Sequence, residues 1–588
     1  MALQPHAMTN LRPTATVRER TNPWIDILVL GGLVALFFSC AQVASEWRHP
    51  LKDQAPMDLS LLKLPKYALF SFVRGWLAYF CSLVFTLLVA SWAYYDTRAH
   101  RYIIPALDIL QSIPVLAFMP PFFLALVALF PRDNTGLELA CVLTIFTGQV
   151  WNMVFSYYDS LRGIPGDFRM LAKLYNLNWW QRFWRVELPF GAQGLLYNSM
   201  VSMAGGWFFL SLSEAPPSIN GVSFRVPGIG SYFKEAMDRG DVKAQVLAIV
   251  AMGMVILIVD RLIWWPLVVW SRKFKMDDFG GSRSPRNGLQ LWLARSATVQ
   301  AAAAAWQAAK MRILGPPVPP SEATSLIDPG APLPKESRLG RAFYTVFLWA
   351  VLGALLWGGY RLFLLLRPVT GSDWADILGD TLISFVRVLA AVLIGSLWTV
   401  PFGVWIGLNP RLSGRLQPLI QFVASFPAPM LYPWLFAIVL FVHGTLQWGA
   451  VLLILFGTQW YILFNVAAAA AAIPNDMISC SEILHLSGWV RWKKFLLPAI
   501  LPGLVTGWIT AAGGAWNATI VAEYAVQAGN KVYYATGLGA YIGKASDDNN
   551  FSRLTAAVIV MSVVVVGINR ALWKRLQRLA NDRCRFIT

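Results

Sequence analysis

An internal duplication constrains the fold most, because stretches of the first half return in the second half at fixed spacings. The tetrapeptide SFVR stands at Ser71–Arg74 and again 313 positions later at Ser384–Arg387. Farther along the chain the spacing is 309, and the residues that recur at it include Gly148/Gly457, Trp151/Trp460, Gly205/Gly514, Trp207/Trp516 and Glu214/Glu523. Two fixed spacings of this kind indicate a tandem repeat within one chain.

Long apolar blocks in both repeats indicate an all-α polytopic membrane protein. Of the 588 residues, 56% are hydrophobic and only 14% are charged, whereas soluble domains carry about 25% charged residues. Blocks of about twenty apolar residues are long enough to cross a bilayer as helices. The predicted transmembrane helices, six per repeat, lie near 25–46, 68–96, 106–130, 137–159, 191–212 and 243–270, then near 342–366, 379–408, 418–442, 445–469, 500–521 and 552–574.

The number of spans and the basic loops predict the orientation. An even number of spans makes both repeats insert in the same direction, with a pseudo-twofold axis along the membrane normal. Basic loops follow the second and sixth spans, and because Lys and Arg gather in cytoplasmic loops, both termini are predicted to be cytoplasmic. The same loops account for the net charge of +18 without a nucleic acid partner.

The predicted divisions of the chain follow from the repeat. They are a cytoplasmic N-terminal tail (1–24), a first repeat (25–275), a cytoplasmic linker with a helix (276–341) and a second repeat (342–588). The first apolar run, from Ile27, could be a secretory signal, but its length favours an uncleaved helix. We interpret the linker as a tether, with its helix over 291–314.

Motifs for metal or nucleotide chemistry are missing from the sequence. The five Cys include no CxxC pair, and the five His include no HExxH motif. The dipeptide GK occurs once, with Leu538 where a P-loop needs its first Gly and Ala545 where it needs a hydroxyl. A nucleotide site in this chain is therefore not predicted, and any ATP-driven step requires another chain.

Two similar segments, one per repeat, lie on the predicted cytoplasmic side between spans four and five. These Leu-Pro segments, 167–189 and 476–498, read DFRMLAKLYNLNWWQRFWRVELP and DMISCSEILHLSGWVRWKKFLLP. Each has apolar residues at helical spacing and closes on a proline, which is predicted to end the short helix before the next span. A short amphipathic helix present once per repeat suits docking on a twofold partner. The alternative is a helix resting on lipid headgroups.

The Leu-Pro segments resemble the cytoplasmic coupling motif of binding-protein-dependent ABC importer permeases. Trp180 and Trp489 stand where the nitrate, sulfonate, taurine and bicarbonate branch commonly has Trp. The sequence departs from the motif at its Glu place and at its Gly place, where the residues are Met170/Ser479 and Asn176/His485. Asn tolerates a left-handed turn, and His tolerates it less well. SFVR, the Pro-rich openings of the third spans and GxGxY after the fifth spans also resemble that branch.

The resemblance implies two fused permease subunits of the type I ABC importer fold. It implies a pathway for a small anion, two cytoplasmic ATPase subunits that bind ATP and Mg, an extracytoplasmic substrate-binding protein and a place in the bacterial inner membrane. No cofactor on this chain is implied. The residues assigned to ATPase coupling are Leu177, Trp180, Arg182, Pro189, Leu486, Trp489, Arg491 and Pro498.

Polar and small residues in the spans are candidates for the pathway. The predicted pathway and gate residues are Ser112, Pro114, Gly205, Trp207, Glu214, Ser425, Pro427, Gly514, Trp516 and Glu523. The two Glu could close a gate or could cap the loop that follows them. Arg74 and Arg387 could attract an anion or could extend to lipid headgroups.

Two other classes compete with the ABC permease. A secondary transporter can also have about twelve spans in two parallel repeats, but it would need buried coupling carboxylates and gives the Leu-Pro segments no role. A membrane-embedded enzyme would need clustered His, Asp or Cys, which the sequence lacks. A co-purifying ATPase would distinguish an ABC permease from a secondary transporter.

Overall fold

The structure, a computed structural model, is almost entirely helical where it describes the chain. The described residues are 22–50, 57–216, 225–271, 288, 292, 295–314, 338–524, 526–528 and 531–584. Most of the predicted N-terminal tail and much of the predicted linker lie outside this set. Within it, the two strands β1 (Val526–Ala528) and β2 (Lys531–Tyr533) form an antiparallel hairpin.

The helices of the two repeats follow the same order. In the first repeat they are α1 (Pro23–Trp47), α2 (Leu64–Tyr95), α3 (Thr97–Ser112), α4 (Val115–Leu129), α5 (Thr135–Arg162), α6 (Gly166–Leu174), α7 (Trp179–Arg182), η1 (Phe183–Glu187), α8 (Leu188–Ser213), α9 (Ile229–Asp238), α10 (Val242–Val259), η2 (Asp260–Trp264) and α11 (Trp265–Ser271). In the second they are α15 (Arg338–Leu366), α16 (Gly371–Gly407), α17 (Pro410–Ser425), η4 (Ala428–Leu431), α18 (Tyr432–Phe441), α19 (Leu446–Ala471), α20 (Asn475–Ile483), α21 (Gly488–Arg491), η5 (Trp492–Leu496), α22 (Leu497–Ala522), α23 (Leu538–Asp547), α24 (Phe551–Ile568), η6 (Asn569–Trp573) and α25 (Lys574–Cys584).

The described residues contain nine helices long and apolar enough to span a membrane, or eleven if each of two bent pairs is one span. The bent pairs fall where the third span of each repeat was predicted. Arg98–Ser112 and Val115–Leu129 meet at 96°, and the corresponding helices of the second repeat meet at 79°. The cause is a proline in each break, because the residue before proline avoids helical angles. Ile113 has ψ 123° and Phe426 has ψ 132°.

Span five runs through the prolines that were predicted to stop the preceding helix. Pro189 and Pro498 both lie inside continuous helical segments, Trp179–Ser213 and Gly488–Ala522. A π-helical turn precedes each proline, and Leu188 N donates to Phe183 O, five residues back. The wider turn accommodates the proline ring and its missing N–H. The prediction of a helix end at these prolines is therefore wrong.

The chain divides into two compact units that do not coincide with the repeats. The smaller unit combines the chain up to Gln42 with Ile164–Gln193 and Arg261–Asp328. It contains the linker helix α13 (Ala297–Leu314), which lies within the predicted 291–314. Asp26 Oδ1 accepts hydrogen bonds from Ser296 Oγ at 2.6 Å and Thr298 N at 3.0 Å, which attach the start of α13 to α1.

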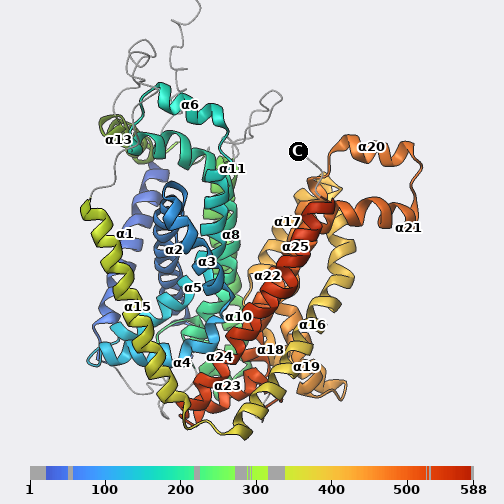
Figure 1. The fold of residues 1–588 in the computed structure, drawn as a ribbon. Coiled ribbons are helices and arrows are strands. Elements are labelled where there is room, and N and C mark those ends of the chain that lie inside the picture. Colours follow the sequence, from blue (N-terminus) through green and yellow to red (C-terminus); the bar gives the residue numbers. More distant parts are fainter. Residues whose placement is uncertain are drawn as a thin grey trace, which may run out of the picture. The chain divides into compact units, whose positions relative to one another are not determined.

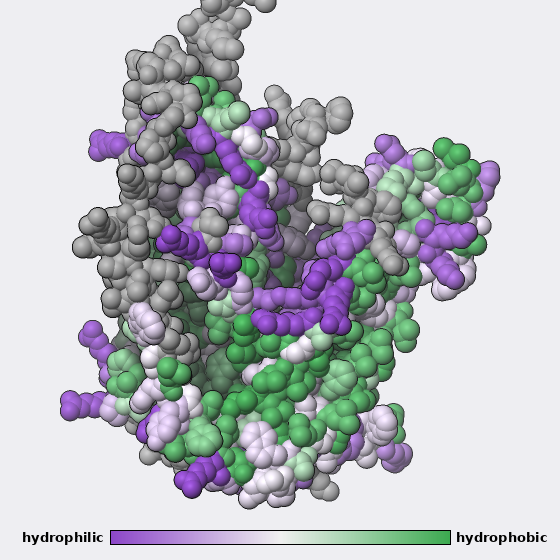
Figure 2. All heavy atoms as spheres, in the orientation of Figure 1, coloured by the Kyte–Doolittle hydropathy of each residue, from purple (hydrophilic) through white to green (hydrophobic). Residues whose placement is uncertain are grey.

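The larger unit contains most of the apolar helices of both repeats. In the second repeat, α16, α19 and α22 run side by side (Figure 1), and their buried side chains share one core with Tyr432 and Phe436. Figure 2 shows hydrophobic side chains over α24 and the helices beside it, and hydrophilic side chains along the basic helix α25. This contrast is typical of a bundle in a bilayer with a basic end in water.

Candidate functional site

Both Leu-Pro segments contain the same left-handed turn, although neither has glycine there. Asn176 and His485 each have φ 49°. Leu177 N donates to Ala172 O and Leu486 N donates to Ser481 O, both at 3.0 Å, so each short helix ends in the same hydrogen-bond pattern. A left-handed residue after a helix is normally glycine or asparagine. Asn176 and His485 therefore adopt the left-handed conformation expected of the glycine in the coupling motif, although both differ from glycine.

The second Leu-Pro segment exposes a group of apolar side chains. Trp489 is 72% exposed, and Ile483 and Leu484 are similarly exposed. These residues belong to α20, α21 and the turn between them, which project from the end of the second repeat's bundle where α25 ends (Figure 1). In the first segment the exposed apolar residues include Met170, Trp179 and Trp180. Exposed apolar groups of this size are typical of an interaction surface.

The first Leu-Pro segment makes contacts that the sequence of the second cannot reproduce. Trp184 packs edge-to-face on Trp306 of the linker helix α13, with ring centroids 6.3 Å apart. Lys493 stands at the equivalent position of the second repeat. Arg182 pairs with the buried Glu187 at 3.0 Å, whereas Arg491 lies 3.8 Å from the exposed Glu482. The predicted coupling residues are thus held more firmly in the first segment.

A buried arginine cluster joins three parts of the first repeat. Arg74 of α2 donates twice to Glu138 of α5, each bond 2.8 Å long, and once to Glu214 at 2.5 Å. Ser71 Oγ donates to Glu214 at 2.6 Å and accepts from Ile229 N at 2.9 Å. The cluster therefore ties α2 and α5 to the end of α8 and to the start of α9. We call it the first arginine cluster.

The second arginine cluster joins the equivalent parts of the second repeat, with one different partner. Arg387 Nη1 donates to Glu523 Oε1 at 2.8 Å, and Ser384 Oγ donates to the same carboxylate. The position of Glu138 is taken by Gln447, whose Oε1 accepts from Arg387 Nη2 at 2.5 Å and whose backbone carbonyl accepts from Arg387 Nε at 3.1 Å. The first cluster thus has two carboxylates around its arginine, and the second has one carboxylate and one amide.

The first glycine of each GxGxY motif lies against one of these carboxylates and leaves no room for a Cβ. A Cβ at Gly228 would lie 2.2 Å from Glu214 Cδ, and a Cβ at Gly537 would lie 2.5 Å from Glu523 Oε2. The next helix then presents its first N–H groups, and Gly230 N donates to Glu214 Oε2 at 2.7 Å. Carboxylates bind well at such helix starts. This is the capping role that the sequence had left as the alternative to a gate.

The clusters also bear on the roles predicted for the two arginines. The side chain of Arg74 is 1% exposed and that of Arg387 is 7% exposed, and both are paired with carboxylates. A charge that is buried and compensated contributes little to attracting an anion from solution. The geometry favours a structural role for both arginines over anion attraction or contact with headgroups.

A cavity of about 240 Å³ lies where the two repeats meet within the larger unit. Its lining includes matched positions of both repeats: Gly148/Gly457, Trp151/Trp460, Asn152/Tyr461, Val201/Thr510, Gly205/Gly514 and Phe208/Asn517. A single water needs roughly 10–15 Å³, so the cavity has room for a small solute. Its pseudo-symmetric lining is expected for a path along the axis that relates the repeats.

The cavity contains some of the predicted pathway residues and leaves out others. Ser112, Gly205, Gly514 and Trp516 line it. Trp207, 2% exposed, instead packs near Gly75 of α2, where a Cβ would lie 3.6 Å from its ring. The predicted pair of tryptophans is therefore not symmetric about the cavity. Ser425 accepts from Gln421, and Pro114 and Pro427 stand at the breaks in the third spans beside the lining.

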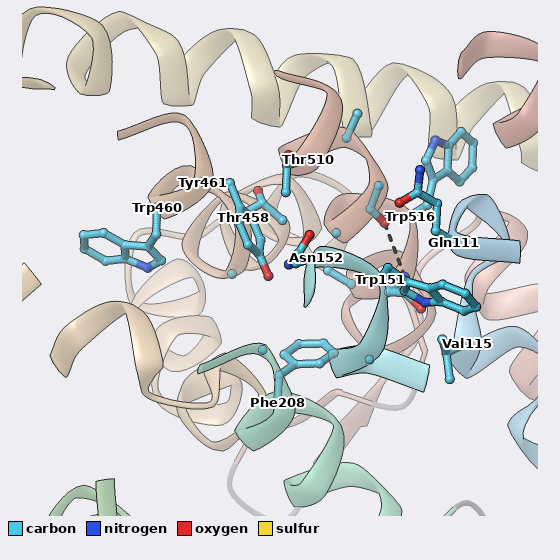
Figure 3. Close-up of a pocket in the computed structure, with 18 of the residues that line it drawn as sticks. Gln111, Val115, Trp151, Asn152, Phe208, Thr458, Trp460, Tyr461, Thr510 and Trp516 are labelled. Carbon is cyan, nitrogen blue, oxygen red and sulfur yellow. Dashed lines mark hydrogen bonds between the residues drawn. The ribbon is translucent and has the colours of Figure 1, made fainter. Parts of the chain in front are cut away.

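The described lining of the cavity contains no Asp, Glu, Lys, Arg or His. Its polar groups are hydroxyls, amides and indoles, and Figure 3 shows the Asn152 amide and the Tyr461 hydroxyl near the middle of the view. The residues predicted from the sequence do not include Asn152, Tyr461, Glu138 and Gln447, because the members of each pair differ and only identical residues mark the repeat. The spacing of 309 itself places Asn152 opposite Tyr461 in the alignment of the repeats.

Comparisons with known proteins match each repeat separately. The family described as binding-protein-dependent transport system inner membrane component matches residues 82–264 and 399–578. The bicarbonate transport system permease protein CmpB of Synechococcus elongatus is 31% identical over 210 residues, which are 35% of this chain and 72% of that protein.

More distant relatives have similar extents. The nitrate import permease protein NrtB of Leptolyngbya laminosa is 28% identical over 199 residues, 34% of this chain and 67% of that protein. The putative aliphatic sulfonates transport permease protein SsuC of Bacillus subtilis is 24% identical over 156 residues, 26% of this chain and 54% of that protein.

Proposed function

The chain belongs to the family of binding-protein-dependent transport system inner membrane components, and we propose that it forms the pathway of an ATP-driven importer for a small anion. Membership makes it a multi-pass permease of the inner membrane rather than an enzyme, and argues against a secondary transporter. The anion proposal rests on relatives named for bicarbonate, nitrate and aliphatic sulfonates. We extend it to a sulfonate such as taurine by the same chemistry.

The partners are part of the proposal. Two ATPase subunits bind the Leu-Pro segments, and an extracytoplasmic binding protein delivers the anion to the opposite end. ATP and Mg are bound by the ATPases, and this chain needs no cofactor of its own. The observation that supports docking is the shared left-handed turn at Asn176 and His485, followed in each repeat by exposed tryptophans. Aromatic and Arg side chains are common anchors at protein interfaces.

The proposed orientation of the chain in the membrane rests on which segments share one end of the bundle. In the second repeat, α20 lies at the end where the basic α25 ends, and α23 lies at the opposite end (Figure 1). Basic segments stay in the cytoplasm, so we place the Leu-Pro segments and both termini there. The arginine clusters then lie towards the extracytoplasmic side, where the binding protein docks.

A native cysteine makes the orientation testable. Cys480 lies on α20 and is exposed. In a variant that retains only this cysteine, a membrane-impermeant maleimide should react with it in inverted vesicles and not in right-side-out vesicles. Added ATPase should then protect Cys480 from the reagent. Reaction in right-side-out vesicles would overturn the orientation, and the docking assignment with it.

Docking itself is tested by removing its aromatic anchors. Trp180→Ala combined with Trp489→Ala should leave the chain inserted and weaken ATPase binding, at about 2 kcal/mol or more for each anchor. The measurement is retention of the ATPase during purification of the chain. Trp448→Ala is the matched control, because Trp448 is 80% exposed on α19 outside the Leu-Pro segments. An ATPase that stays bound to the double variant as it does to the control would contradict the proposal.

The two anchors should not contribute equally. Trp489 is 72% exposed and Trp180 is 38% exposed, so a partner can bury more new surface at Trp489. The stacking of Trp180 on Phe183, with centroids 6.0 Å apart, already stabilises it within its own segment. We expect the single Trp489→Ala variant to lose more ATPase than the single Trp180→Ala variant.

A further inference from the structure

The cavity between the repeats is polar without being charged. Most of its hydroxyl and amide groups already make hydrogen bonds within the protein. Thr147, Thr458 and Thr510 donate to backbone carbonyls, and Asn569 donates to Ser112 at 3.1 Å. These groups are occupied and add little to the binding of a solute.

Two side chains at equivalent positions of the repeats differ from these occupied groups. In the described part of the chain, no residue bonds to the side chain of Asn152 or to the hydroxyl of Tyr461. The hydroxyl lies close to the opposite repeat, because a Cβ at Gly205 would be 3.8 Å from Tyr461 Oη. Figure 3 shows both polar groups in the same part of the cavity. The indoles of Trp151 and Trp516 also line the cavity.

The chemistry of such a place limits what can occupy it. An anion that leaves water needs donors to replace its hydration, and hydrogen bonds to a charged group are stronger than those between neutral groups. Amide, phenol and indole groups supply donors without a full positive charge. The cost of desolvating an ion rises with the square of its charge, so a dianion needs about four times the compensation of a monovalent anion of the same size. Neutral donors can therefore accommodate a monovalent anion, but fall short for a divalent one.

We propose that Asn152 and Tyr461 form a neutral hydrogen-bonding site for a small monovalent oxyanion in transit, and that this site disfavours dianions. The proposal rests on the proposed function and specifies the class of solute. Because neither group carries charge, the anion is held weakly and can leave, as a transport path requires. The site selects monovalent anions over dianions, in addition to the selection made by the binding protein.

Occupancy can be measured on the full chain alone, in nanodiscs, without an ATPase or a binding protein. The reporter is the Thr510→Cys variant in a chain whose native cysteines are replaced by Ser, because Thr510 lines the same cavity. The rate of thiol modification is measured with nitrate, bicarbonate or methanesulfonate, and with sulfate at equal ionic strength. We expect at least one monovalent anion to slow modification about threefold or more, and sulfate to leave it unchanged.

Second variants show whether the named residues are responsible. Tyr461→Phe and Asn152→Asp in the reporter chain should abolish protection by the monovalent anion. Tyr541→Phe is the matched control, because it also removes a hydroxyl without a partner among the described residues, on α23 and outside the cavity lining. Protection should survive in that control.

The outcomes separate this proposal from the proposed function. Equal protection by sulfate and nitrate would overturn the selection by charge. Protection that persists in Tyr461→Phe and Asn152→Asp, or that no monovalent anion gives, would overturn the site. A failure of the proposed function would appear elsewhere, as a chain that binds no ATPase in the purification experiment.

Discussion

The first and second arginine clusters occupy the same place in the two repeats with different charges. Arg74 is surrounded by two buried carboxylates, Glu138 and Glu214, whereas Arg387 has one carboxylate and the amide of Gln447. In each cluster one residue accepts from both Nε and Nη2 of the arginine: Glu138 does so with its two carboxylate oxygens, and Gln447 does so with its backbone carbonyl and its Oε1. The difference teaches that this position requires the geometry of an acceptor, and that the charge of that acceptor is free to vary.

The largest expected effect comes from removing the arginines. Arg74→Ala would leave two buried carboxylates without a cation, and removing one partner of a buried pair costs about 3–5 kcal/mol. Arg387→Ala would leave only one carboxylate, so we expect it at the lower end of that range and Arg74→Ala at the upper end. Thermal unfolding of the detergent-purified chain measures both.

A pair whose arginine stays in water gives the control for these two variants. Arg553 lies 2.9 Å from Asp373, and the Arg553 side chain is 47% exposed while that of Asp373 is 9% exposed. Asp373 also accepts hydrogen bonds from Thr370, so it keeps partners without Arg553, and a pair of this kind contributes only about 0–1 kcal/mol. Arg553→Ala should therefore change the unfolding temperature little. If Arg74→Ala is no more harmful than Arg553→Ala, the first cluster does not stabilise the fold.

The glycines beside the carboxylates should distinguish the clusters next. At Gly228 an added Cβ only collides with Glu214, because φ is −178°, whereas Gly537 combines a collision with φ 145°. Overpacking costs about 1–3 kcal/mol, so Gly537→Ala should destabilise more than Gly228→Ala. Gly379→Ala, with open space around its Cβ, should be neutral or stabilising in the same unfolding assay. Equal effects at all three sites would show that the contact with the carboxylate is unimportant.

Exchanging the differing partner tests the comparison most directly. Glu138→Gln removes one buried charge, but it also replaces a carboxylate oxygen that accepts from Arg74 by an NH2 group, which can only donate. We therefore expect Glu138→Gln to lower the unfolding temperature, because a buried N–H of Arg74 loses its acceptor at a cost of about 1–3 kcal/mol. Gln447→Glu keeps an acceptor oxygen at Arg387 and adds one buried charge, so we expect a smaller loss. A Glu138→Gln variant as stable as the parent would mean that a single acceptor oxygen is enough at this position.

The smallest effect concerns the left-handed turns of the Leu-Pro segments. Left-handed angles cost an ordinary residue about 1–2 kcal/mol, and Asn less. His485→Gly should therefore slow hydrogen exchange in α20 more than Asn176→Gly slows it in α6. A similar change in both segments would indicate that the two repeats bear the same strain at this turn.

The repeat, the helical class and the existence of the turn could be predicted from the sequence. Periodicity and fixed spacing need only the order of residues, and Asn176 at the glycine place of a motif indicates a left-handed turn. The bends at Pro114 and Pro427 and the π-turns before Pro189 and Pro498 could not be predicted in form. A proline indicates a disturbed helix, but its surroundings decide between a break and a wider turn.

The partners of the buried charges also could not be predicted from the sequence. Glu138 lies 64 residues from Arg74 and Glu214 lies 140 residues from it, so neither pairing follows from local spacing. Trp207 and Trp516 illustrate the converse limit. They share a position in the repeat, yet only Trp516 lines the cavity, because packing around each helix differs.

The joining of both repeats in one chain has a consequence for the cavity. In a homodimer every substitution appears on both sides of the axis, so equivalent positions of the two walls always carry the same side chain. Here Asn152 of one repeat and Tyr461 of the other line one cavity. A mutation can alter one wall and leave the other intact, so an unlike pair of donors can be adjusted one member at a time. The covalent linkage also keeps the two halves in a fixed one-to-one proportion and at high effective concentration, so the two unlike walls of the cavity always come from the same molecule.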